Sequence, residues 1–254
     1  MIGPPPAFLG DFGEAIEFIF KERESVSGGV QIGGIPELAG FGATHMEVSI
    51  AALLIAAVLA IPVALWLGHI GRGDFVATAT SNVGRAVPSL ALLAFFISFV
   101  GLGYTNVIAV LVLLAIPPLI TNTYVGVRQV DRDTVDAARG MGVSGMEIVR
   151  KIELPLALPA IFDGMRTSAV NVVATATIAP LANVQTLGEP IITPQTYGFV
   201  GQLGAAIVVA VITIAVDFAF ARLQWAVTPA GLKLAGPAPR RLFALPIKRR
   251  PEST

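Results

Sequence analysis

Long uncharged stretches separated by clusters of charged residues dominate this sequence. The stretch from Val48 to Gly68 is 21 residues long and carries no charge. As a helix it would cross about 30 Å of hydrocarbon, because each helical residue adds about 1.5 Å. Four further stretches have a similar character, so five membrane-spanning helices are predicted in all: 48–68, 75–103, 107–127, 155–181 and 199–225.

The second of these stretches has a charged residue near its middle. Arg85 begins the sequence Arg85-Ala86-Val87-Pro88, and a proline inside a helix removes a backbone hydrogen-bond donor. A break at this point would divide the second span into two short helices and raise the total to six. Both versions are all-α integral membrane folds, and five spans is the central prediction.

Composition identifies lipid as the surrounding medium. Hydrophobic residues make up 54% of the 254 positions and charged residues 13%, with a mean hydropathy of +0.76. Soluble domains carry about 25% charged residues, so this chain has too few charges to cover the surface of a cytosolic enzyme. The formal net charge of zero gives no basic surplus for nucleic acid, and the absence of cysteine excludes disulfides and thiolate chemistry.

Lysine and arginine are unevenly distributed between the loops. They cluster in 128–151 and in the tail 233–250, whereas 103–106 and 182–196 contain none. Basic loops stay on the cytoplasmic side of a membrane. With five spans, the N-terminus is therefore expected outside and the C-terminus in the cytoplasm.

Three regions follow from this pattern. Residues 1–46 form an extracytoplasmic segment with an amphipathic helix, which would lie in the membrane interface or pack against the protein's own outer loops. Its glycine-rich part, 27–42, is expected to be a flexible connection. Residues 47–232 form the transmembrane domain, and 233–254 a basic, disordered cytoplasmic tail.

The loop 131–155 predicts two short helices around a glycine turn. Asp133 is expected to cap the first helix, and Gly142 stands where a left-handed stop is needed. Ser144-Gly145-Met146-Glu147 is a capping box that opens the second helix, which Leu154-Pro155 is expected to end. Such a stiff projection suits docking of a soluble partner, although a loop that only closes the bundle would show the same pattern.

The same loop resembles the EAA motif of ABC importer permeases. That motif is Glu-Ala-Ala, three residues, Gly, nine residues and Ile-x-Leu-Pro. All the spacings match here, and Asp136 stands where glutamate is usual. The resemblance assigns coupling to an ATPase to seven residues: Asp136, Ala137, Ala138, Gly142, Ile152, Leu154 and Pro155.

Further runs resemble the osmoprotectant branch of these permeases, so that the likeness covers roughly residues 47–232. They are Arg85 to Ala94, Asn122 to Arg128, Ala137 to Gly142 and Thr228 to Leu232. The resemblance implies a type I importer permease with a MetI-like helical bundle in the bacterial cytoplasmic membrane. Its implied function is ATP-driven import of osmoprotectants such as glycine betaine, choline, carnitine or proline by alternating access.

The resemblance also implies partners. These are an ABC ATPase dimer, a second permease chain that is identical or related, and an extracytoplasmic substrate-binding protein. No G-x-x-x-x-G-K-[ST] loop is present, so ATP and magnesium are expected in the ATPase and no cofactor in this chain. The chain is accordingly expected not to be an enzyme.

No catalytic or metal-binding constellation stands out in the sequence. The two histidines, His45 and His69, flank opposite ends of the first span and are expected at the membrane interface. Asp163 and Arg166 are expected to pair on one helix face, and Asp217 and Arg222 to be structural. Polar or kinked positions within spans are candidates for the transport pathway: Arg85, Pro88, Ser89, Asn122 and Asn171.

For several of these positions a structural role is the alternative. Arg85 could contact the carboxylate of a betaine or close a kinked span, and the asparagines could bond neighbouring helices. Another small zwitterion or an amino acid could be the cargo of the same architecture. An ion-coupled secondary transporter is a further alternative, which would require an inverted repeat that the sequence does not show.

Overall fold

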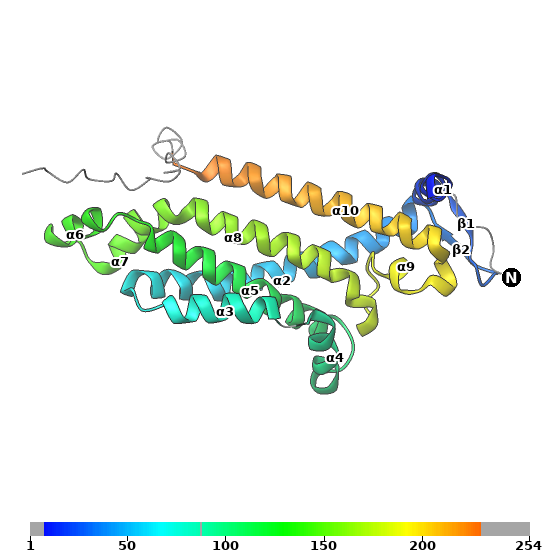
Figure 1. Cartoon of the computed structure of the whole chain (residues 1–254), viewed down its shortest axis with the longest axis horizontal. Coiled ribbons are helices and arrows are strands. Elements are labelled where there is room, and N and C mark those ends of the chain that lie inside the picture. Colours follow the sequence, from blue (N-terminus) through cyan, green and yellow to red (C-terminus); the bar gives the residue numbers. More distant parts are fainter. Residues whose placement is uncertain (1–7, 87, 230–254) are drawn as a thin grey trace, which may run out of the picture.

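Five helices run side by side along the longest axis of the protein: α2, α3, α5, α8 and α10 (Figure 1). The computed structural model describes residues 8–86 and 88–229. The N-terminal part comprises α1 (Phe8–Phe20), β1 (Glu22–Glu24), β2 (Gln31–Gly33), α2 (Gly34–Ile70), α3 (Asp74–Ala86) and α4 (Ser89–Val100). It is followed by α5 (Tyr104–Arg128), α6 (Arg132–Gly140), α7 (Gly145–Ile148), a π-helix (Val149–Glu153), α8 (Leu154–Thr175), a 3-10 helix (Ala176–Ala182), α9 (Glu189–Ile192) and α10 (Pro194–Val227).

Helix α5 lies at the centre, in contact with α2, α3, α4 and α8. Small residues let these helices approach closely, as is usual between membrane helices. On α2 the buried alanines recur every fourth position at Ala52, Ala56, Ala60 and Ala64. Near the end of α2, a Cβ atom at Gly68 would lie 2.7 Å from Cβ of Val127 on α5, so the backbone of α2 packs directly against the Val127 side chain.

The structure has three helices that are long and apolar enough to cross a membrane, α2, α5 and α10, among the residues described. They contain the first, third and fifth predicted spans. The fourth, 155–181, is α8 followed by the 3-10 helix. The prediction of one helix over 75–103 is wrong, because α3 ends at Ala86 and α4 begins after Pro88, whose backbone is extended. Helix α4 then runs across the direction of the long helices (Figure 1).

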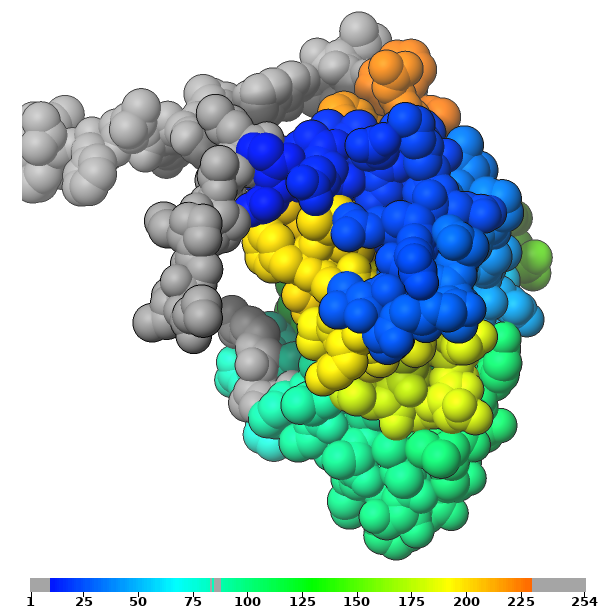
Figure 2. Space-filling view, turned by 90° about the vertical axis from the view of Figure 1, so that its right-hand side faces the viewer, coloured from blue at the N-terminus to red at the C-terminus, as the bar shows by residue number. Residues whose placement is uncertain are grey.

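The N-terminal segment forms a small cap on one end of the bundle. Helix α1 and the hairpin lie over the start of α10 (Figure 2). Phe18 of α1 is 1% exposed and fills a notch on α10, where Cβ atoms at Gly201 and Gly204 would lie 3.3 and 2.8 Å from its ring. Helix α1 thus packs against its own chain, while Phe12, Ile16 and Phe20 are left exposed on its surface.

The glycine-rich stretch 27–42 is not a flexible connection. Strand β2 pairs antiparallel with β1, with Gly33 opposite Glu22, and α2 begins directly at Gly34. Burial of Leu38, which is 5% exposed, holds the first turns of α2 in place despite their glycines. The predicted tail 233–254 lies outside the described residues.

Candidate functional site

The loop 131–155, here called the coupling segment, projects from the end of the bundle opposite the N-terminal cap (Figure 1). Its first helix, α6, is capped by Asp131, whose carboxylate accepts the backbone N–H of Asp133 at 3.1 Å. The predicted cap, Asp133, is therefore wrong by two residues. Asp131 takes this role because its extended backbone places the carboxylate over the free N–H groups of the first turn.

The turn after α6 has the predicted geometry. Gly142 has φ +80°, and Val143 N–H donates to the carbonyl of Ala138 at 3.1 Å. Such a left-handed residue closes a helix while satisfying its last carbonyls. The predicted left-handed stop at Gly142 is confirmed.

The second helix opens with the predicted capping box. Glu147 N–H donates to the Ser144 hydroxyl at 3.4 Å, and Ser144 N–H donates back to the Glu147 carboxylate at 3.3 Å. The Lys151 ammonium at 3.0 Å, together with the bonds from Ser144, lowers the pKa of Glu147. A negative charge is thereby held at the positive end of α7.

This second helix does not end at Leu154-Pro155, contrary to the prediction. Helix α7 continues through the π-helix into α8, and the backbone of Glu153 and Leu154 stays helical. Leu154 N–H donates to the carbonyl of Val149, five residues earlier. The wider π turn accommodates Pro155, which has no N–H to donate. The second helix of the coupling segment is thus joined to α8 as one uninterrupted helix.

The seven candidate coupling residues divide into two groups. Asp136, Ala137 and Gly142 lie on the exposed surface. Ala138 is 3% exposed and shares a small apolar core with Val135 and Ile148, against which Ile152 packs. Leu154 packs against a separate cluster at the base of the bundle, and Pro155 lies in the first turn of α8. The first group can touch a partner, and the second keeps the segment rigid.

Two residues of this surface were missed from the sequence. Met141 and Met146 are 78% and 58% exposed, on either side of the Gly142 turn. Exposed flexible methionines are common at protein-binding surfaces. The sequence did contain a signal for their exposure, because both methionines stand next to the predicted turn and outside the apolar stripe of either helix.

The structure brings two of the candidate pathway residues together. A cavity of about 290 Å³ opens between α3, α5 and α8, and both Asn122 and Asn171 line it. The remaining lining residues are Ser81, Gly84, Leu114, Pro117, Pro118, Thr121 and Thr167. Hydroxyl and amide groups supply the polarity, and no charged side chain is among these residues. Pro88 and Ser89 lie at the start of α4 and do not line it, and the side chain of Arg85 lies outside the described part of the chain.

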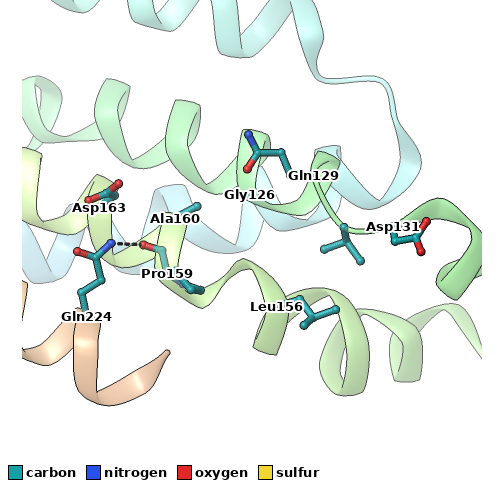
Figure 3. A pocket seen from close by; sticks show the side chains of 9 residues that line it. Gly126, Gln129, Asp131, Leu156, Pro159, Ala160, Asp163 and Gln224 are labelled. Atoms are coloured by element: carbon teal, nitrogen blue, oxygen red, sulfur yellow. Dashed lines mark hydrogen bonds between the residues drawn. The ribbon is translucent and has the colours of Figure 1, made fainter. Parts of the chain in front are cut away.

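A second cavity, of about 540 Å³, lies near the coupling segment between α5, α8 and α10 (Figure 3). Asp163 and Gln224 line it, and the Gln224 amide donates to the Pro159 carbonyl at 2.9 Å.

The expected pair of Asp163 with Arg166 is wrong, because the Arg166 guanidinium reaches across to Asp217 on α10. Asp217 is structural in this sense, as expected.

Both histidines, which the sequence predicts at the membrane interface, have side chains that pack within the protein. His45 is 0% exposed, with Nε2 2.8 Å from the carbonyl oxygen of Val173 on α8. It is buried because α2 begins at Gly34 and continues past it. His69 is 9% exposed, with Nδ1 2.7 Å from Oε2 of Glu153.

Comparison with known proteins assigns this chain to a family. Residues 37–230 match the family described as "Binding-protein-dependent transport system inner membrane component". The chain belongs to this family. It is therefore a membrane protein and a permease component of a transport system, and the resemblance to ABC importer permeases is confirmed.

The curated relatives include three permeases with stated cargo. The chain is 32% identical to the glycine betaine/carnitine/choline permease OpuCB of Bacillus subtilis over 197 residues, which cover 74% of this chain and 88% of that protein. It is 33% identical to the choline permease OpuBB of the same organism, with the same coverage. It is also 33% identical to the carnitine permease OpuCB of Listeria monocytogenes, covering 75% of this chain and 88% of the relative.

Among solved structures, the inward-facing MetNI methionine ABC transporter is similar to this chain. The TM-score is 0.64, with 22% identity, covering 76% of this permease and 96% of that chain. At this identity the similarity shows the fold alone. The predicted MetI-like, all-α membrane fold is confirmed.

Proposed function

We propose that this permease belongs to an ATP-driven importer of osmoprotectants, which carries quaternary amines such as glycine betaine, choline and carnitine, or proline. The observation that carries the proposal is the 32–33% identity to three permeases named for these cargoes, each covered over 88% of its length. The cavity between α3, α5 and α8 is compatible with such cargo. Its uncharged amides and hydroxyls can contact a small zwitterion without holding it by a full charge.

The permease is proposed to lie in the bacterial cytoplasmic membrane with the coupling segment in the cytoplasm. That orientation places the basic loops inside, as the distribution of lysine and arginine requires. The N-terminal cap then faces outward, where a substrate-binding protein delivers cargo. A second permease chain, identical or related, completes the membrane part, and the ATPase dimer holds ATP and magnesium.

In this proposal the exposed group of the coupling segment docks on one ATPase subunit. Asp136 contributes a carboxylate, which makes a weak surface pair with Arg139 of the same helix at 3.7 Å. Ala137 and Gly142 allow close approach, and Met141 and Met146 supply adaptable apolar contact. Closure of the ATPase dimer would then move the segment and switch the permease between inward-open and outward-open states.

The test is uptake of labelled glycine betaine by cells that lack their own osmolyte importers and express this permease with its genomic neighbours. Gly142→Asp should abolish uptake, because a side chain at φ +80° strains the turn. Gly142→Asn is the matched control of nearly the same size, because asparagine is among the residues that adopt the left-handed conformation and, unlike aspartate, adds no charge to the docking surface. Uptake should survive in the control.

Three results would change the proposal. Normal uptake with Gly142→Asp would remove the coupling role of the turn. A stable complex with an ATPase but no uptake of glycine betaine, choline, carnitine or proline would keep the permease and discard this cargo in favour of another zwitterion or an amino acid. Uptake without any ATPase would instead support an ion-coupled secondary transporter.

A further inference from the structure

The hydrogen-bonded pair of His69 and Glu153 lies where the coupling segment meets the helix bundle. His69 is in the last turn of α2, and Glu153 is the last residue of the π-helix, 84 positions later. Their side chains are 9% and 1% exposed, and Nδ1 lies 2.7 Å from Oε2. The contact is short, buried and directional.

The surroundings of this pair are rigid on both sides. On the α2 side, Gly68 lies against Val127 of α5, so the end of α2 cannot shift without α5. On the other side, Nε2 of His69 faces the start of α7, where a Cβ atom at Gly145 would lie 3.2 Å away. The imidazole is therefore held between the bundle and both ends of the second coupling helix.

Stability alone does not explain a polar pair at this place. A buried ion pair is often no more stabilising than apolar side chains of similar volume. Here one carboxylate oxygen, Oε1 of Glu153, is buried without a hydrogen-bond partner. Such an unsatisfied atom is rare in native proteins and calls for an explanation. The pair also sits on a π turn, a feature found frequently at functional sites.

We propose that His69 and Glu153 form the joint through which displacement of the coupling segment reaches α2. This inference rests on the proposed coupling of the segment to an ATPase. Helix α8 follows the second helix of the segment, because α7, the π-helix and α8 are one continuous helix, whereas α2 is joined to it across space. With the pair intact, α2, α5 and α8 move as one body at this end of the bundle. Both are positioning residues, because they act through the helices they join.

The experiment uses the permease assembled with its ATPase and binding protein in liposomes. Glu153→Leu and His69→Leu each break the pair, and we expect cargo imported per ATP hydrolysed to fall about tenfold or more, within the usual range of coupling between sites. Glu153→Gln is the conservative variant, because a side-chain amide can both donate to and accept from an imidazole nitrogen, and it should keep most of the coupling. Lys21→Gln, which breaks the exposed 2.8 Å pair with Glu17 on α1, is the control and should change nothing.

The double variant His69→Leu with Glu153→Leu tests whether the pair transmits movement or only stabilises the packing of the two helices. Two leucines replace the pair with apolar side chains, so thermal stability lost in the single variants should return. The proposal expects stability to return without import. Import restored to the wild-type level by the double variant would overturn it, and so would unchanged import in both single variants. Loss of the ATPase from a folded single variant would also overturn it, because the pair would then serve assembly.

A second readout does not depend on the cargo. The chain contains no cysteine, so spin labels can be placed at Val58→Cys on α2 and Arg150→Cys on the π-helix, both exposed positions. With the joint intact, ATP should leave the distance between these labels unchanged. In the Glu153→Leu variant, ATP should shift this distance or broaden its distribution. An ATP-dependent change in the intact protein would overturn the joint even if the cargo is not an osmoprotectant. If the distance between the labels responds to ATP as expected in both proteins but no import is observed, the result would count against the proposed cargo instead.

Discussion

Arg166 of α8 and Asp217 of α10 form a bidentate ion pair, with Nε 2.5 Å from Oδ1 and Nη2 2.6 Å from Oδ2. The pair ties α10 to the rest of the bundle in a region that the sequence predicts to lie in the membrane. Asp163, three residues before Arg166, lines the cavity of Figure 3 instead. The planar guanidinium matches a carboxylate best when both oxygens are reached, and Asp217 offers that geometry.

Loss of this pair should destabilise the permease. Asp217→Asn leaves the Arg166 guanidinium without its carboxylate partner, and the partial exposure of both side chains limits the resulting loss of stability. Thermal unfolding of the purified protein in detergent should show a Tm lowered by several degrees. Asp163→Asn removes a neighbouring charge outside the pair and should have a smaller effect. Equal effects of the two substitutions would contradict this view.

Gly188 should not tolerate even alanine. A Cβ atom there would lie 1.8 Å from the carbonyl oxygen of Thr177, and a backbone atom cannot move aside as a side chain can. The φ of Gly188 is −73°, so the effect is purely steric. Gly188→Ala should cost about 3 kcal/mol, the upper end of typical overpacking. The matched control is Gly40→Ala, at a helical position with open space, which should be neutral or stabilising by up to about 1 kcal/mol in the same unfolding measurement.

Phe18 should be the residue that holds the N-terminal cap to the bundle. Its ring is 1% exposed and meets Tyr197 edge-on, with the ring centroids 6.3 Å apart. Phe18→Ala empties the notch on α10, which should cost the cap about 3–5 kcal/mol. Limited proteolysis should then remove the first residues faster than in the wild type. Phe20→Ala, at a position that is 64% exposed, should leave the rate unchanged, and equal rates for the two variants would refute the anchoring role.

The start of α7 should weaken at acid pH. The pKa of Glu147 is lowered in the folded protein, chiefly by Lys151 and then by Ser144. Its contribution is therefore present above the pKa of the unfolded chain and is lost as the pH falls through the lowered folded value. Between neutral pH and about pH 3, Glu147→Gln should flatten the fall in Tm relative to the wild type. Lys151→Gln removes the largest cause of the shift and should flatten it in part. Identical curves for wild type and Glu147→Gln would exclude this role.

The parts of the fold that were predictable are those with a local signal. Helices α2, α5 and α10 follow from long apolar stretches, and the break before α4 from Pro88. The N-terminal cap was not predictable in the same way. Its glycines indicate flexibility by their intrinsic preference, and only contacts with distant residues, such as Phe18 with α10, override that preference.

In the candidate site, too, the features with a local sequence signal were predictable and the contacts between distant residues were not. Gly142 and the capping box of Ser144 and Glu147 are encoded within six residues, and the structure has both. The pairs His69 with Glu153 and Arg166 with Asp217 join residues 84 and 51 positions apart. No periodicity in the sequence specifies which distant side chain a buried charge will meet. The sequence could place these charges near helix ends, but not choose their partners.

The continuity of α7, the π-helix and α8 makes the coupling segment the short arm of a lever. Helix α8 has 22 residues, which at about 1.5 Å per residue is a rod of roughly 33 Å. If such a rod pivots by about 10°, its far end sweeps about 6 Å, a distance comparable to one helical turn. A small tilt imposed at the segment would therefore arrive enlarged at Asn171, in the last turns of α8, where the cavity between α3, α5 and α8 is lined.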